Sequence, residues 1–185
     1  MSTPPDALTE LMTIVTGYQR SRALMVVAEL GIADLLRDGP RSVDELARAT
    51  HTHSPTLYRV LRSLAAVGVF EERPGRMLAL TPISEFLRSD AAVPYGHLAR
   101  LFGRDYQWAA WGALLHSVRT GESAARHVLG VDIWSYRQDH PEENASRVGI
   151  HPQYGRKQRA SASTDIGDRC APSEVVCRRF YGSAR

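Results

Sequence analysis

The chain has 185 residues, 43% of them hydrophobic, which is enough to bury one core of ordinary size. No apolar run approaches the roughly 20 residues that cross a bilayer, and the opening Met-Ser-Thr-Pro-Pro-Asp is unlike a signal peptide. These features argue against membrane insertion and predict a soluble protein of the cytoplasm. The two cysteines, Cys170 and Cys177, are too few to predict a zinc site or a disulfide framework.

The formal net charge of +3 is unevenly distributed along the chain. Residues 1–146 hold 15 arginines and 17 acidic side chains, a net charge of −2. Residues 147–185 hold seven arginines, one lysine and three acids, a net charge of +5, and contain no leucine. Because charge and core-forming residues change at the same point, we predict a folded domain over 1–146 and an irregular, disordered tail over 147–185.

The N-terminal segment has a strongly apolar helical pattern. Apolar residues recur at helical spacing across residues 8–30, and only Gly17 interrupts them. Gly31 ends this pattern, and residues 32–36 predict a further helical turn. Helices this apolar offer more surface than a small domain can cover, so we predict a homodimer formed through them.

Residues 42–82 carry the most specific local signals. Ser42 and Glu45 make a capping box, which predicts the start of a short helix. Ser54 followed by Pro55 predicts the N-cap and first residue of a second helix. The apolar positions of this second helix recur three and four residues apart and are Leu57, Val60, Leu61, Leu64 and Val67.

Two short β-prone runs follow, at residues 67–72 and 77–80, separated by the turn Arg73-Pro74-Gly75-Arg76. Thr81-Pro82 predicts a short helix that ends at residue 87. Two helices and a two-stranded wing predict a winged-helix unit. The fold class is therefore mainly α, with a winged-helix core and extra helices before and after it.

The wing is followed by three more helical patterns, over residues 94–103, 106–119 and 131–141. Pro141 predicts the first turn of a further helix. Aromatic residues are concentrated in the first two of these patterns. An aromatic stripe at helical spacing is typical of a packed core, and a binding pocket is the alternative. The residues concerned are Phe102, Tyr106, Trp108 and Trp111.

A winged helix raises the possibility of a DNA-binding transcriptional regulator, but the charge argues against it. The domain is net acidic, and Glu71 and Glu72 flank the predicted wing, which weakens the attraction to phosphate. The side chains at positions that would meet DNA are Tyr58, Arg59, Arg62, Arg73 and Arg76.

No catalytic or metal-binding set emerges from the sequence. The seven histidines show no spacing typical of metal ligands, and no serine lies in a nucleophile elbow. We therefore predict neither a metal site nor hydrolase chemistry.

Five segments occur in an order that points to a known family: ALMVVAELGIADL (23–35), YRVLRSLAAVGVF (58–70), Leu80-Thr81-Pro82, WGALLHSVRTGE (111–122) and WSYRQDHPE (134–142). Together they resemble the N-terminal domain of bacterial S-adenosylmethionine-dependent O-methyltransferases, which act on small aromatic or polyene hydroxyl compounds. The resemblance implies a winged-helix dimerisation domain that interlocks with its two-fold mate and closes one wall of the substrate pocket. It also implies that the four aromatic residues named above line that pocket.

The resemblance stops near residue 146. In the family a Rossmann-like domain follows, with closely spaced glycines for the cofactor and a histidine as catalytic base; here no Gly-x-Gly occurs, and His151 matches no motif. The sequence therefore predicts that this chain alone neither binds S-adenosylmethionine nor transfers a methyl group. A truncated methyltransferase with a frameshifted tail, a genuine short form, and a non-catalytic partner of a full-length methyltransferase are the open alternatives.

Overall fold

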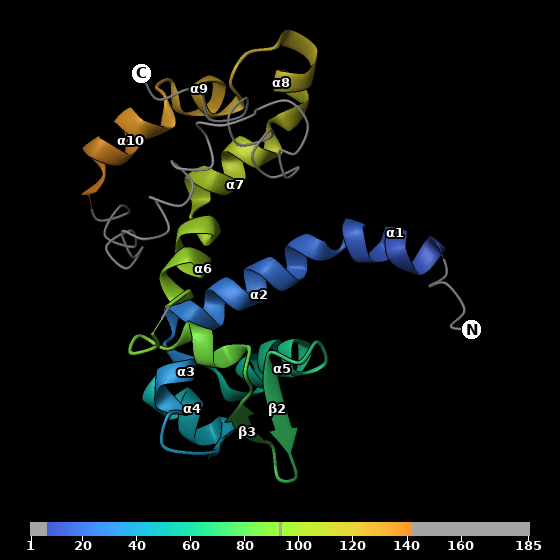
Figure 1. The fold of residues 1–185 in the computed structure, drawn as a ribbon, viewed down its shortest axis with the longest axis vertical. Coiled ribbons are helices and arrows are strands. Elements are labelled where there is room, and N and C mark those ends of the chain that lie inside the picture. The colour runs from blue at the N-terminus through green and yellow to red at the C-terminus, as the bar shows by residue number, and fades with distance from the viewer. Residues whose placement is uncertain (1–6, 93, 142–185) are drawn as a thin grey trace. The chain divides into compact units, whose positions relative to one another are not determined.

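The structure is a computed structural model that describes residues 7–92 and 94–141 (Figure 1). The chain divides into two compact units, Met1–Arg100 and Leu101–Arg185. The described part is mainly helical, as predicted, with a small antiparallel sheet. The predicted tail, 147–185, lies outside it, as does the continuation of the helix predicted at Pro141. Within the described residues, no helix combines the length and hydropathy that a membrane crossing needs.

The first unit opens with the predicted apolar helices, α1 (Ala7–Val15) and α2 (Gly17–Glu29), with α1 at the free end of α2 in Figure 1. The break falls at Thr16, whose hydroxyl donates to the carbonyl of Met12 at 2.7 Å. Gly31 then adopts a φ of 63°, a conformation that glycine takes without strain, and α3 (Ile32–Leu35) follows as predicted.

The capping box at the start of the next helix is confirmed. The Ser42 hydroxyl accepts from the Glu45 amide at 3.3 Å, and the Glu45 carboxylate accepts from the Ser42 amide at 2.9 Å. These two bonds satisfy amides that the first turn of a helix leaves unpaired. The elements of this part are β1 (Arg41–Ser42), α4 (Val43–Ala49), α5 (Ser54–Ala65), β2 (Phe70–Arg73) and β3 (Met77–Leu80).

The predicted N-cap of α5 is wrong by one residue. The helix begins at Ser54 with His53 as its N-cap, and the His53 carbonyl accepts from the Leu57 amide at 2.9 Å. The Ser54 hydroxyl does not cap the helix, because it donates instead to the carboxylate of Asp44 in α4.

The predicted hairpin is present, but its first strand starts at Phe70 rather than at residue 67. Residues 67–69 form a tight turn in which Gly68 has a φ of 79° and the Val69 amide donates to Leu64. β2 and β3 pair antiparallel from Phe70 opposite Leu80 to Arg73 opposite Met77. The two-residue strand β1 was not predicted; it adds to the far side of β3, which gives the order β1-β3-β2.

The helices α2 to α5 and the sheet enclose one apolar core. It contains the apolar positions predicted for α5 except Val60, which is only partly buried, and Val67, which is exposed. The largest fully buried apolar side chains of this core are Val27, Ile32, Leu36, Val43, Leu46, Leu61, Leu64, Phe70 and Leu78.

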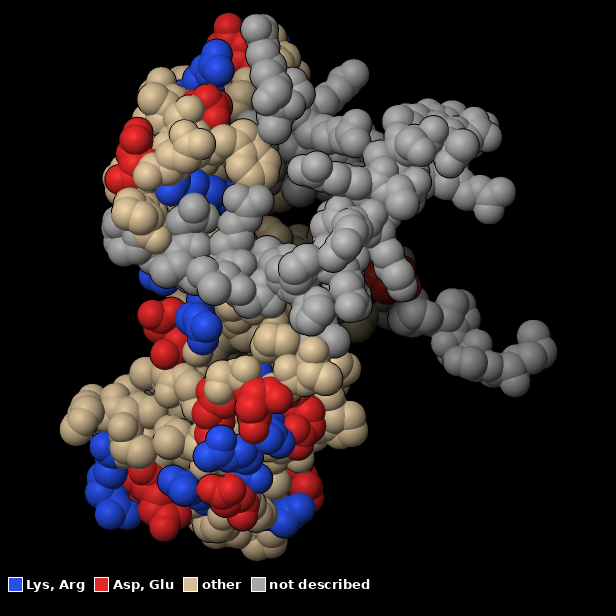
Figure 2. All heavy atoms as spheres, turned by 60° about the vertical axis from the view of Figure 1, so that its left-hand side comes forward, with Lys and Arg blue, Asp and Glu red and all other residues tan. Residues whose placement is uncertain are grey.

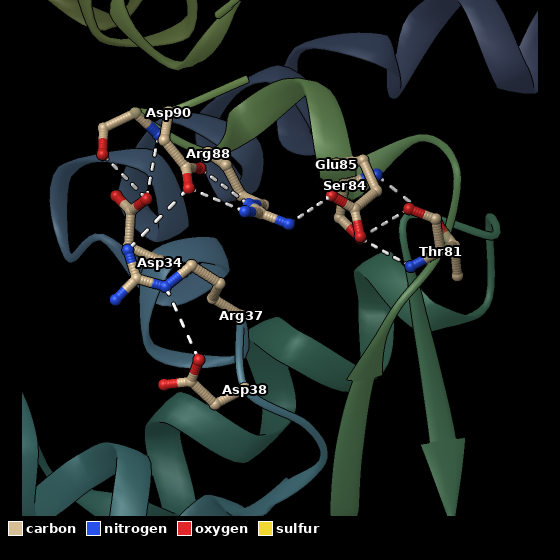
Figure 3. Close-up of polar contacts among 9 residues, drawn as sticks. Asp34, Arg37, Asp38, Thr81, Ser84, Glu85, Arg88 and Asp90 are labelled. Carbon is tan, nitrogen blue, oxygen red and sulfur yellow. Dashed lines mark hydrogen bonds and ion pairs between the residues drawn. The ribbon is translucent and has the colours of Figure 1, made fainter. Parts of the chain in front are cut away.

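The segment after the hairpin is a 3-10 helix, η1 (Ser84–Leu87), tied to α3 by polar contacts (Figure 3). Arg88 donates to Glu85 at 2.8 Å and to both carboxylate oxygens of Asp90 at 2.8 and 2.7 Å. Asp34 accepts from the amide of Ser89 at 2.8 Å. These contacts fix the chain reversal that precedes α6 (Gly96–Gly103).

The described residues of the second unit that follow α6 form four short helices: α7 (Asp105–Gly112), α8 (Leu114–Thr120), α9 (Ala124–Leu129) and α10 (Ile133–Asp139). The single helix predicted over 106–119 is wrong, since it is interrupted at Ala113, directly after the poor helix former Gly112. Helix α9 was missed; Ser123 caps it by accepting from the Arg126 amide at 3.4 Å. The helix predicted to begin near residue 131 is confirmed, with Asp132 as its N-cap.

Candidate functional site

Helix α1 carries an apolar face that is exposed in the part of the chain that the structure describes. None of its residues is buried, and Leu11 and Ile14 are 55% and 77% exposed. The stripe follows the spacing of one helix face, and the polar residues Thr9 and Thr13 lie away from it. An apolar surface of this kind marks a protein contact. The exposed apolar side chains of α1 are Leu8, Leu11, Met12, Ile14 and Val15.

The four aromatic residues proposed for a substrate pocket occupy different environments. Tyr106 is 4% exposed, and its hydroxyl accepts from Arg137 at 3.1 Å. Trp108 is partly buried, whereas Phe102 and Trp111 are exposed. Tyr106 is therefore held inside the unit, whereas the side chains of Phe102 and Trp111 are exposed at its surface.

Sequence reasoning missed the cluster that surrounds Tyr106. The ring of Tyr136 lies 5.1 Å from that of Tyr106 and stacks on His140 at 4.0 Å. The Arg137 guanidinium lies 5.6 Å from the Tyr106 ring and 5.4 Å from that of Trp134. The four-residue spacing of Tyr136 and His140 on one helix was the signal in the sequence.

Helix α8, in the second unit, carries exposed apolar side chains, as α1 does in the first unit. Leu114, Leu115 and Val118 are all exposed on it, Val118 to 73%, and Trp111 of α7 is also exposed. No residue of α8 is buried. The unit therefore offers an apolar surface beside its aromatic residues.

The surface formed by α5 and the β2–β3 hairpin, here named the helix–hairpin surface, is polar. Tyr58 donates to Glu72 at 2.6 Å, which raises the pKa of the Tyr58 hydroxyl above its ordinary value. Arg73 binds both oxygens of Glu71, at 3.0 and 2.9 Å, and lowers the pKa of that carboxyl. Figure 2 draws one face of the molecule as a whole, without singling out this surface, and on that face acidic and basic side chains are intermixed.

A hollow of about 460 Å³ lies against this surface, between α5 and β2. Its charged lining consists of Arg62, Glu71 and Glu72. It does not match S-adenosylmethionine, the cofactor that the resemblance implies, because its two carboxylates are engaged by Arg73 and Tyr58.

The histidines do not assemble a metal site in the part of the chain that the structure describes, where no group of three potential ligands converges. His116 and His127 stack face to face at 3.8 Å, and Nε2 of His116 lies 3.4 Å from the Glu122 carboxylate. Stacked rings place their faces, not their nitrogens, toward each other.

The sequence model of the O-methyltransferase dimerisation domain matches residues 12–90. The phenazine O-methyltransferase PhzM of Lysobacter antibioticus is 40% identical over 159 residues, which cover 85% of this chain and 46% of that protein. The mitomycin biosynthesis 6-O-methyltransferase of Streptomyces lavendulae is 39% identical over 70% of this chain and 37% of its own length.

Solved structures agree with the sequence matches. The crystal structure of LaPhzM superposes with a TM-score of 0.77 and 36% identity, over 88% of this chain and 48% of that one. The mitomycin 7-O-methyltransferase MmcR superposes with a TM-score of 0.70 and 37% identity, over 76% of this chain and 42% of that one. The chain thus spans about half the length of the relatives it matches, and these matches do not favour the transcriptional regulator. By sequence and fold, residues 12–90 are an O-methyltransferase dimerisation domain.

Proposed function

We propose that this chain forms a homodimer through α1 and α2 and serves as the assembly domain of an S-adenosylmethionine-dependent O-methyltransferase. The observation that carries this proposal is the bare apolar face of α1, which buries none of its own residues. A helix of nine residues is marginal in water without packing partners, so its apolar face needs a cover. A second copy supplies an identical helix, which suits a two-fold contact.

The relatives indicate the class of substrate. The names of three similar enzymes refer to phenazine, mitomycin and a dihydroxynaphthoate. These are ring compounds, so the substrate that we propose is a small aromatic hydroxyl compound. The cofactor, when bound, supplies an electrophilic methyl group to the substrate hydroxyl; similar proteins have been solved with S-adenosylmethionine or S-adenosylhomocysteine.

The described residues take a binding and shaping role in this proposal. We assign the helix-turn-helix and hairpin to a winged-helix core within a domain over residues 1–146. Of the four aromatic candidates, we propose Phe102 and Trp111 as the ones that contact a flat substrate, because their side chains are exposed. Aromatic rings recognise one another through offset or edge contacts, which fits such a substrate.

Sedimentation velocity of the full chain tests the assembly. We expect a dimer for the wild type and a shift toward monomer for Leu11→Asp, since a carboxylate would be buried in the contact. The matched control is Thr13→Asp, which adds the same charge to the polar side of the same helix. A wild-type monomer at high concentration, or equal behaviour of the two variants, contradicts the proposal.

A further inference from the structure

We propose that Glu71 and Glu72 keep the helix–hairpin surface from binding nucleic acid. The argument rests on the contacts of α5 and the hairpin and does not depend on the proposed dimer or methyltransferase function. A helix-turn-helix followed by a hairpin is a scaffold that can dock on a duplex. What this surface does therefore depends on whether its cationic groups are free to reach phosphate.

The arginine at the tip of β2 is already occupied. Arg73 gives two hydrogen bonds to Glu71, from Nε at 3.0 Å and from Nη2 at 2.9 Å. This two-point geometry is the one that a guanidinium uses to bind phosphate. Glu71 therefore takes the position that a phosphate group would need.

The second glutamate, Glu72, holds a side chain of α5. Glu72 accepts from the Tyr58 hydroxyl at 2.6 Å, so the proton of this hydroxyl is directed to the hairpin. Arg76 lies over the ring of Tyr58, 4.5 Å from its centroid, and donates to the Ser54 hydroxyl at 3.4 Å. Tyr58 and Arg76 are thereby packed on each other rather than extended toward solvent.

The two glutamates cover both faces of their strand. Glu71 lies opposite Ala79 and Glu72 opposite Leu78, and successive residues of a strand point to opposite faces. A phosphate approaching the hairpin from either face therefore meets a carboxylate.

The net charge of the helix–hairpin surface depends strongly on Glu71 and Glu72. Residues 54–80 contain four arginines and two acidic residues, Glu71 and Glu72, which gives a net charge of +2. Without the two carboxylates the same segment would carry +4, and Arg73, released from Glu71, would add to Arg59, Arg62 and Arg76. Affinity for DNA increases with the number of phosphates that a protein neutralises.

Another role for these charges is protection of the sheet edge. β2 is an outer strand in the order β1-β3-β2, and charged side chains on an outer strand prevent pairing with other chains. That role predicts self-association when the charges are removed, and our proposal predicts binding to DNA. The two can be separated by experiment.

The test is fluorescence anisotropy of a labelled DNA duplex titrated with the full chain. The test variant is Glu71→Gln/Glu72→Gln; the control, Asp38→Asn/Asp139→Asn, removes the same charge from two exposed positions outside this surface and outside α1 and α2. At about 50 mM salt we expect the test variant to bind at least about tenfold more tightly than the wild type and the control. Between about 50 and 200 mM salt its affinity should fall about tenfold more than theirs, as two added phosphate contacts imply.

Adding Arg59→Gln and Arg62→Gln to the test variant should remove the gain. Equal gains in the test and control variants would show that net charge alone matters, and would overturn the proposal. It is also overturned if the test variant gains no affinity, or if it only self-associates. Circular dichroism confirms that each variant is folded.

Discussion

Gly96 faces the backbone of Leu87 so closely that a Cβ on Gly96 would lie 2.6 Å from the Leu87 carbonyl oxygen. Backbone atoms cannot move aside as a flexible side chain can, so any larger residue must displace the start of α6. We expect Gly96→Ala to lower the free energy of unfolding by about 1–3 kcal/mol, the usual cost of overpacking. Urea denaturation followed by circular dichroism measures it.

Gly112 is the matched control for this substitution. Nothing lies within 4 Å of a Cβ placed there, and alanine favours a helix more than glycine does. We expect Gly112→Ala to be neutral or to stabilise by up to about 1 kcal/mol. If Gly96→Ala behaved like Gly112→Ala, the close approach to Leu87 would be wrong.

His51 adopts a φ of 53°, which is unfavourable for a residue with a Cβ. His51→Gly should therefore raise the free energy of unfolding, by about 0.5–1 kcal/mol. The neighbouring His53 has a φ of −77°, so His53→Gly should instead lower stability. Thermal melts of the two variants should shift in opposite directions, and a shared direction would contradict the assignment.

The capping box makes stability depend on pH. Hydrogen bonds from Ser42 lower the pKa of Glu45 below its ordinary value of 4.5. A lowered pKa in the folded state stabilises the fold above the unfolded value, and this stabilisation is lost as pH falls through the folded value. We expect Glu45→Gln to reduce the loss of melting temperature between pH of about 5 and about 3.

Ser42→Ala is the companion variant, and it should cost about 1 kcal/mol at neutral pH, the usual value of an N-cap. Asp38→Asn, a surface carboxylate outside the box, serves as the control for the pH series. If Asp38→Asn flattened the acid transition as much as Glu45→Gln, the capping box would not be its source.

Arg88 holds the reversal between η1 and α6 (Figure 3). Its hydrogen bonds lower the pKa of Asp90 and leave the carboxylate ionised at lower pH. In Arg88→Ala we expect the pKa of Asp90 to rise and the amides of residues 88–92 to exchange faster. Arg37→Ala, which removes a contact of 3.8 Å to Asp90 and one of 3.7 Å to Asp38, should change both quantities less. NMR titration and hydrogen exchange measure the two effects, and an unchanged Asp90 would refute the role of Arg88.

Most helices of the first unit, and the capping box of α4, could be predicted from the sequence because they depend on neighbouring residues. Gly17 interrupts the apolar pattern and Gly31 ends it, and the Ser42–Glu45 box needs only a three-residue separation. The apolar face of α1 could be predicted in the same way, because its apolar residues recur at the spacing of one helix face. These are the parts of the candidate site that sequence analysis anticipated.

What the sequence could not decide were the interactions between residues far apart in the chain. Ser54 has the character of an N-cap but bonds to Asp44, and Tyr58 has the position of a DNA contact but bonds to Glu72. Strand β1 exists only because β3 is beside it, and Asp34 meets Ser89 across 55 positions of sequence. A side chain with several possible partners takes the one that folding brings within hydrogen-bond distance, so the tertiary structure alone determined these pairings.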